Sequence, residues 1–264
     1  MKIIVLLKQV PDTNQVKIDP KTGTLIRQGV PSIINPDDKF ALEGAVRLKE
    51  EFGGTVTILS MGPPQAKDAI MEGIAMGADD GILLSDRMFA GADTWATSYS
   101  LSQALKKIGD YDIIFAGRQA TDGDTAQIGP QTAEALDIPQ VTYVYDVQMQ
   151  EDGKTIRVKK AMEDGYEVLD VPLPALLTCI KDLNVPRYPS ISGIQRAVSV
   201  EIPVWSAADV DAEPEKIGLK GSPTMVAKTF TPEPACRGDC ISGTCEDVVT
   251  QLINKLQEIN ILKE

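Results

Sequence analysis

The chain contains no histidine, and this absence excludes several kinds of chemistry. Histidine is the side chain that most often moves protons near neutral pH, and it is a common metal ligand. Hydrolytic triads built on histidine are therefore excluded, and a histidine-bound zinc or haem would need ligands from a partner chain. The chemistry must come from a bound cofactor or from carboxylates, and we expect a cofactor carrier.

The chain also lacks long apolar runs and an excess of positive charge. No stretch of about 18 apolar residues is present, so we expect no membrane insertion. The first apolar run, residues 2–7, is too short for a signal peptide and has no small-residue cleavage site, which predicts a cytoplasmic protein. Lys and Arg number 26 against 38 Asp and Glu, giving a formal charge of −12. Because no basic patch stands out, nucleic acid is not an expected partner.

Cysteine is scarce, but three of the four cysteines lie close together, at Cys236, Cys240 and Cys245. Thiolates at such a spacing can hold an iron–sulfur cluster, for which Cys179 is a distant fourth ligand. The alternative is three free thiols in a glycine-rich loop, because the usual set of four is incomplete. A disulfide is not expected in a reducing compartment. We expect no metal, and these three cysteines are the candidate ligands if one binds.

Short apolar runs alternate with amphipathic stretches in the first half of the chain. The runs at residues 3–7, 56–60, 81–84 and 112–116 are typical of buried parallel strands. Helices are predicted between and after them, at residues 37–52, 63–76, 93–108 and 127–136. This alternation predicts an α/β fold with a doubly wound, mostly parallel sheet, which binds ligands at the carboxyl ends of its strands.

The remaining segments add strands and a C-terminal arm. Residues 16–34 contain a turn signal between extended runs and are predicted to form a hairpin. Additional strands are predicted from the period of two at residues 141–147, 155–160, 166–171 and 175–179. Beyond residue 203 the periodicity is lost until an amphipathic helix at residues 246–262. We expect a nucleotide-binding domain over residues 1–202 and an arm over 203–264 that wraps a partner subunit; the alternative is a mobile tail.

The loop at residues 116–131 is the strongest indication of a ligand. It follows a buried strand, precedes a helix and contains Gly117, Gly123 and Gly129, which allow close approach of a backbone to a ligand. The N-terminus of the following helix favours a phosphate. Asp122 and Asp124 would repel one, so we expect one or both to cap the helix. The alternative is a strand–turn–helix corner without a ligand, since the loop is neither a P-loop nor a G-x-G-x-x-G motif.

Several motifs occur in a fixed order: KQVPD at 8–12, NPDD at 35–38, EGAVRLK at 43–49, SMGP at 60–63, AMGAD at 75–79, the loop at 117–131, and NVPRY at 184–188. In this order they resemble the beta (small) subunit of electron transfer flavoproteins over nearly the whole chain. The resemblance implies a heterodimer with a larger alpha subunit and a nucleotide bound to the beta subunit. In simple members of the family that nucleotide is AMP, and in bifurcating members it is a second FAD.

Carried over by position, the resemblance implies that the nucleotide is contacted by Leu6, Asn35, Pro36, Asp37, Asp38, Met61, Ala120, Thr121, Asp122, Gly123, Asp124, Thr125, Ala126, Gln127, Ile128, Gly129, Pro130 and Gln131. Residues 121–127 resemble the bifurcating branch, and small residues there leave room for a flavin. We therefore favour FAD over AMP. Arg118 is interpreted either as stabilising an anionic flavin or as a subunit-interface arginine.

The implied mechanism is electron transfer within an alpha–beta complex. NADH delivers a hydride to the beta-bound FAD; one electron goes to ferredoxin or flavodoxin, and the other goes through the alpha-subunit FAD to a flavin-dependent dehydrogenase. NADH oxidation is expected only within this assembly. The alternatives are a non-bifurcating subunit with structural AMP, and a non-redox sensor module that binds an adenine nucleotide.

Residues 187–194 resemble the family's recognition loop, which docks onto the dehydrogenase. The resemblance implies partner contacts from Arg187, Tyr188, Pro189, Ile191 and Ile194, with Ile191 as the apolar anchor. The alternative is that Ile191 is buried against its own domain.

Overall fold

The computed structural model describes residues 1–12, 31–227, 238 and 240–262. The chain divides into two compact units, Met1–Ala227 and Lys228–Glu264. The first unit extends beyond the boundary expected at residue 202, because Val210, Ala212 and Ile217 are buried. The second unit contains the helix α6 (Cys245–Glu258), which covers most of the helix expected at residues 246–262.

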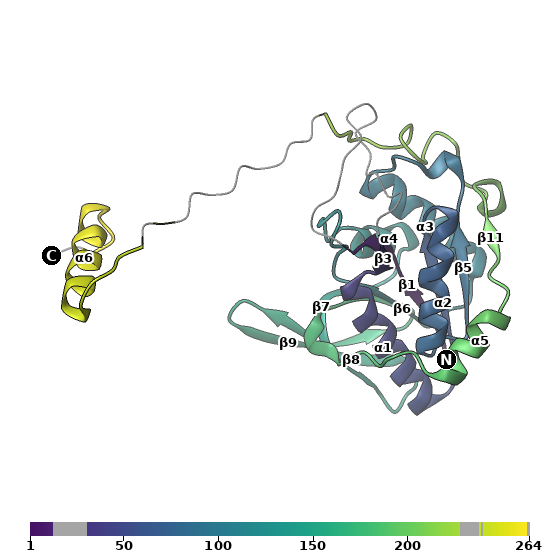
Figure 1. Ribbon diagram of the computed structural model, residues 1–264. Helices are drawn as coiled ribbons and strands as arrows, with labels where there is room; N and C mark the ends of the chain where they lie inside the picture. The colour runs from purple at the N-terminus through teal and green to yellow at the C-terminus, as the bar shows by residue number, and fades with distance from the viewer. Residues whose placement is uncertain (13–30, 228–237, 239, 263–264) are drawn as a thin grey trace. The chain divides into compact units, whose positions relative to one another are not determined.

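A nine-stranded sheet, formed by described residues, is the centre of the first unit (Figure 1). Its strand order is β11-β5-β4-β1-β6-β10-β7-β8-β9. The strands from β11 to β7 are parallel, whereas β8 and β9 are antiparallel additions at one end. Their bounds are β1 (Lys2–Leu6), β4 (Thr55–Met61), β5 (Asp80–Leu84), β6 (Ile113–Gly117), β7 (Gln140–Met149), β8 (Thr155–Met162), β9 (Gly165–Pro172), β10 (Ala175–Cys179) and β11 (Val204–Trp205).

Helices cover both faces of this sheet. Odd-numbered residues of β1, such as Ile3 and Val5, belong to one core cluster with residues of α1, α2 and α5. Even-numbered residues, such as Ile4 and Leu6, belong to a second cluster with residues of α3 and α4. The helices are α1 (Pro36–Phe52), α2 (Lys67–Met76), α3 (Thr94–Ile108), α4 (Ile128–Leu136) and α5 (Ile191–Ser199), with single turns η1 (Pro64–Ala66), η2 (Arg87–Phe89), η3 (Lys181–Leu183) and η4 (Ala208–Val210). The doubly wound, mostly parallel α/β fold is confirmed.

The limits of α1 follow from its sequence. Asn35 precedes the helix and Pro36 is its first residue, where the missing N–H of proline costs nothing. Asp37 and Asp38 place negative charge in the first turn, which the helix dipole favours. Gly53, at φ 74°, ends the helix in a conformation that favours glycine.

The order of the strands places a topological switch point at one edge of the sheet. From β1 the chain passes through α1, β4 and α2 to β5, and then α3 carries it back to β6 on the opposite side of β1. The connections after β1 and β6 therefore diverge, and ligands bind at such switch points, outside the carboxyl ends of the strands. The predicted nucleotide residues end β1 and β4, at Leu6 and Met61, or lie in the segments that follow β3 and β6, and the carboxyl ends of β1, β4 and β6 lie at this edge.

Two smaller observations complete the fold. The strands β2 (Gln9–Pro11) and β3 (Ser32–Ile34) form a separate antiparallel pair. The hairpin expected at residues 16–34 lies mostly outside the described residues, and only β3 belongs to it. Among the described helices, none is long and apolar enough to cross a membrane.

Candidate functional site

The carboxylate of Asp38 joins the ends of the two strands at the switch point. Its Oδ2 accepts a hydrogen bond from the backbone N–H of Lys8 at 2.7 Å, and its Oδ1 accepts one from the N–H of Gly117 at 3.1 Å. Lys8 follows β1, Gly117 ends β6, and Asp38 lies in the first turn of α1. Burial raises the pKa of Asp38 to about 7, although the bonds from Lys8 and Gly117 oppose this rise. A buried carboxyl group therefore joins the ends of β1 and β6 to the start of α1. We call this region, with the loop from Gly117 to Gln131 and the start of α4, the corner.

Asn35 fixes the loop that follows β6. Its side chain is fully buried; Nδ2 donates to the carbonyl of Gln119 at 2.8 Å, and Oδ1 accepts from the N–H of Thr121 at 3.1 Å. Its own N–H donates to the carbonyl of Lys8 at 2.9 Å. Because both side-chain atoms are used within the chain, Asn35 positions the loop instead of presenting its amide to a ligand.

The contacts shown for the two acidic residues of the loop lie away from the first turn of α4 and do not support the expected cap. Asp122 is nearly buried and forms an ion pair with Lys8 Nζ at 2.6 Å, and Asp124 accepts a hydrogen bond from Gln119. The residue at the start of α4, Gln127, makes no capping hydrogen bond with its side chain to any described residue. The first turn of α4 is thus left with amide donors that suit a phosphate, and Lys8 offsets the nearest carboxylate.

The three glycines of the loop differ in the space around the position where a Cβ would lie. A Cβ at Gly117 would collide with Asp38, and a Cβ at Gly129 would collide with Thr178 of β10. These two glycines are thus explained by close packing within the chain. Around Gly123, in contrast, no atom of the described residues lies within 4 Å of the position of a Cβ. The sequence predicts close approach of a ligand at all three glycines, but only Gly123 has open space at the position of a Cβ.

The predicted nucleotide residues separate into three groups by exposure. The buried ones, which support the corner from inside, are Leu6, Asn35, Asp38 and Gly129. The partly buried ones are Asp37, Met61, Ala120, Asp122, Ala126, Ile128, Pro130 and Gln131. The exposed ones, which are open to a ligand, are Pro36, Thr121, Gly123, Asp124, Thr125 and Gln127.

Arg118 adds a positive charge beside the corner. Its Nε lies 3.4 Å from Oδ2 of Asp37, and its side chain is about one-third exposed (36%). Burial raises the pKa of Asp37, and the positive charge of Arg118 opposes this rise. The Nε atom is buried and makes no hydrogen bond to the residues that the structure describes. An unused donor of this kind fits an anionic ligand group.

Three residues that shape this corner were not among the predicted contacts: Lys8 and Gln119, which lie in two of the sequence motifs, and Thr94, which lies outside them. Thr94, the first residue of α3, contacts Gln127 through their side chains at 3.0 Å. The position of Lys8 directly after the first strand, at the edge where ligands bind, was a usable signal. The other two contacts depend on how the loop folds, which the residue types alone do not show.

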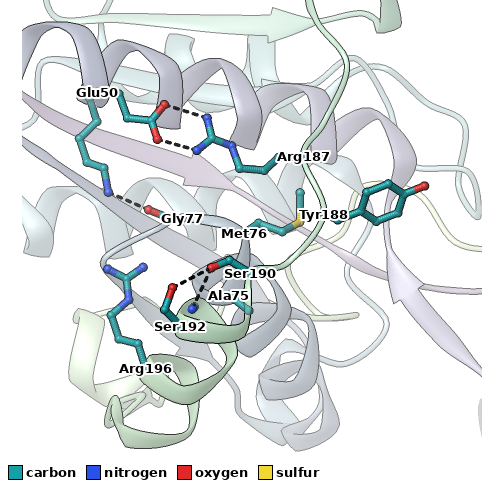
Figure 2. A pocket seen from close by; sticks show the side chains of 11 residues that line it. Glu50, Ala75, Met76, Gly77, Arg187, Tyr188, Ser190, Ser192 and Arg196 are labelled. Carbon is teal, nitrogen blue, oxygen red and sulfur yellow. Dashed lines mark hydrogen bonds and ion pairs between the residues drawn. The ribbon is translucent and has the colours of Figure 1, made fainter.

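The segment predicted to dock onto a partner is tied to α1 by ion pairs (Figure 2). Arg187 Nε donates to Oε2 of Glu43 at 2.8 Å, and its Nη atoms donate to the two oxygens of Glu50 at 2.5 and 2.8 Å. Burial would raise the pKa of Glu43, but hydrogen bonds from Arg187 and Arg47 hold it below its usual value. The charge of Arg187 is thus used within the chain, and its role is to position the segment.

Most of the rest of this segment is exposed, and Gly193 is its one buried residue. A pocket of about 380 Å³ lies between it and the C-terminal ends of α1 and α2, away from the nucleotide corner. In Figure 2 the ring of Tyr188 points away from the other labelled side chains. Tyr188 and Ile191 are 93% and 89% exposed, and Ile194 is 51% exposed. The alternative that Ile191 is buried against its own domain is therefore wrong.

The cysteines offer no assembled metal site among the described residues. Cys240 and Cys245 are exposed, and Cys236 lies outside the described residues. Cys179 is fully buried in β10, where burial raises the pKa of its thiol. Because metal ligation needs the thiolate, Cys179 does not fit the role of a fourth ligand.

The buried carboxyl of Asp38 predicts a pH dependence of stability. In the native state it keeps its proton up to about pH 7, whereas in the unfolded chain it loses the proton near its ordinary value of 3.8. The native state then binds more protons between these values, so this contribution to the free energy of unfolding falls as pH rises from about 4 to 7. We expect Asp38→Asn to make that slope shallower in denaturant titrations. The variant also loses an acceptor and about 1–3 kcal/mol.

The control for this experiment is Asp68→Asn, which removes an exposed carboxylate in the first turn of α2. An Asp38→Asn protein with the same pH slope as the wild type would contradict the proton linkage.

Loss of Arg187 is expected to destabilise the fold. Arg187→Gln leaves the buried carboxylate of Glu43 with Arg47 alone, so we expect a loss of about 1–3 kcal/mol, less than for a fully buried pair because the guanidinium is partly exposed. Thermal or urea unfolding measures the effect. The matched variant Arg157→Gln, which breaks a half-exposed pair with Asp170, should change stability little. Equal losses of stability in the two variants would show that the pair of Arg187 and Glu43 contributes no more than an exposed ion pair.

Comparison with known proteins gives the family. The model of the electron transfer flavoprotein domain matches residues 22–210. The beta subunit of an electron transfer flavoprotein from Clostridium acetobutylicum is 56% identical over 258 residues, 98% of each chain. The caffeyl-CoA reductase-Etf complex subunit CarD of Acetobacterium woodii is 54% identical over 99% of this chain and all of the relative. The acryloyl-CoA reductase electron transfer subunit gamma of Anaerotignum propionicum is 47% identical, again over 99% and 100%. Over nearly its whole length the chain is similar to beta subunits of electron transfer flavoproteins. These matches show that the chain belongs to the electron transfer flavoprotein family.

Proposed function

We propose that this chain is the beta subunit of an electron-bifurcating flavoprotein and holds FAD at the corner formed by β1, β6 and α4. The observation that carries the proposal is the start of α4, which Gln127 leaves without a side-chain cap among the described residues. Its amides suit the diphosphate of a dinucleotide. Next to it, Gly123 and Thr125 are exposed.

The charges at the corner support a phosphorylated ligand. Asp122 is paired with Lys8 and nearly buried, so its negative charge is offset beside the loop. Arg118 contributes a second positive charge, with an unused buried donor. FAD is favoured over AMP because residues 121–127 resemble the bifurcating branch, and the open space at the Cβ position of Gly123 is compatible with this choice.

The loop after β6 and the start of α4 would hold FAD, which would supply acceptance of a hydride from NADH and release of the electrons one at a time. This chain would bind and orient it without a side chain that makes or breaks bonds. The proposed electron acceptors are ferredoxin or flavodoxin and, through the alpha subunit, a flavin-dependent dehydrogenase. Two relatives are named after caffeyl-CoA reductase and acryloyl-CoA reductase, which supports a reductase of CoA thioesters as the partner.

The C-terminal arm is proposed to bind the alpha subunit. On α6 the apolar residues Val249, Leu252 and Ile253 are exposed, at a spacing that puts them on one side of the helix. A partner that covers them would bury an apolar face. The non-redox sensor is set aside because the chain belongs to a family of electron carriers.

Nucleotide content of the purified alpha–beta complex tests the proposal. We expect two FAD and no AMP per heterodimer, together with NADH-driven reduction of ferredoxin. The variant Gly123→Trp should lose one FAD because the indole fills the open space, whereas Lys106→Trp, exposed in the last turn of α3, should keep both. One FAD and one AMP in the wild-type complex would reduce this site to a structural role and overturn bifurcation.

The exposed segment after Arg187 is proposed to dock onto the dehydrogenase through Ile191. An apolar side chain this exposed, at the first residue of α5, is suited to fill a pocket on a partner. We expect Ile191→Asp to weaken binding of the co-purifying dehydrogenase at least about tenfold. Ile191→Leu keeps the apolar surface and should bind normally, and FAD content should not change in either variant. Normal binding by Ile191→Asp would assign docking to another surface.

A further inference from the structure

Tyr143 has a strained backbone at the carboxyl edge of the sheet. Its φ angle is 57°, in the left-handed region that bulky residues rarely adopt. The register between β10 and β7 shifts here: Leu177 pairs with Val141 and Cys179 with Val144, so β7 carries one extra residue. Such a bulge re-aims a side chain and is frequent beside functional sites. The side chain of Tyr143 remains 42% exposed.

The bulge places this ring beside Arg118. The guanidinium carbon of Arg118 lies 6.0 Å from the centre of the Tyr143 ring, at the outer range of a cation–π contact. The backbone N–H of Arg118 donates to the carbonyl of Cys179 at 2.9 Å, which fixes its position at the end of β10. The Nε atom of Arg118 makes no hydrogen bond to any described residue and lies 3.4 Å from Oδ2 of Asp37, with which it forms an ion pair.

We propose that Tyr143 and Arg118 form a further part of the nucleotide site, which binds the planar ring system of the flavin. The ring of Tyr143 stacks against one face of that system, and the positive charge of Arg118, beside this ring, stabilises the negative charge that a flavin gains on reduction. A neutral adenine ring would use the stacking but not the charge. The inference rests on the proposed function, since it places the redox-active end of the same ligand.

The strain at Tyr143 makes the proposal testable, because glycine at this position removes both the ring and the strain. We expect Tyr143→Gly, in the alpha–beta complex, to bind the second FAD about tenfold more weakly, within the range for aromatic stacking. Without flavin, its unfolding temperature should be unchanged or higher. Tyr143→Phe keeps the ring and should bind normally. Arg118→Gln should shift the reduction potential of this FAD to more negative values.

The control is Asp137→Gly, which relieves a φ of 55° at the far end of α4 and should leave flavin binding unchanged. Wild-type binding by Tyr143→Gly, or weak binding by Tyr143→Phe, would overturn the stacking. A lower unfolding temperature of flavin-free Tyr143→Gly would assign the residue to packing and also overturn it. An unshifted potential in Arg118→Gln would remove the charge role. A wild-type complex without a second FAD would overturn the proposed function as well, whereas the other results leave it intact.

Discussion

One buried carboxylate holds the corner on which the site depends. The connections that follow the parallel strands β1 and β6 lead to opposite faces of the sheet, and here Asp38 ties the ends of both strands to the start of α1. Burying this group is unfavourable, as its raised pKa shows, and two backbone amides partly offset that cost. Once this clamp is in place, Asn35 can reach Gln119 and Thr121 and set the path of the loop.

The local charge around the loop differs from the net charge of the chain. The protein is acidic, at a formal charge of −12, and carries four aspartates around this corner. Asp122 is neutralised by Lys8, Asp37 faces Arg118, and Asp38 tends toward its protonated form near neutral pH. An acidic sequence can therefore offer an environment suited to a phosphate, because binding depends on the nearest charges and dipoles rather than on their sum.

The sequence predicts the fold well because its periodicities are strong. Buried runs such as residues 3–7 and the amphipathic helices have clear periods, and the rule for switch points then locates the binding edge. Other features depend on distant contacts: Lys8 meets Asp122 across 114 positions, and the spaces at Gly117 and Gly129 are filled by neighbours that residue types do not reveal. Residues 204–205 form a strand too short to show a period. The bulge at Tyr143 likewise has no signature in the sequence.

The helix α1 serves two places on the molecule with different residues. Its first turn carries Asp38, whereas Glu43 and Glu50, further along, hold Arg187 and the exposed segment behind it. The segment from Arg187 to Ile194 shares no residue with the nucleotide corner. Substitution of its exposed side chains therefore leaves the carboxylate of Asp38 and the anchors Glu43 and Glu50 in place. Two surfaces that depend on different turns of one helix can change in evolution independently of each other.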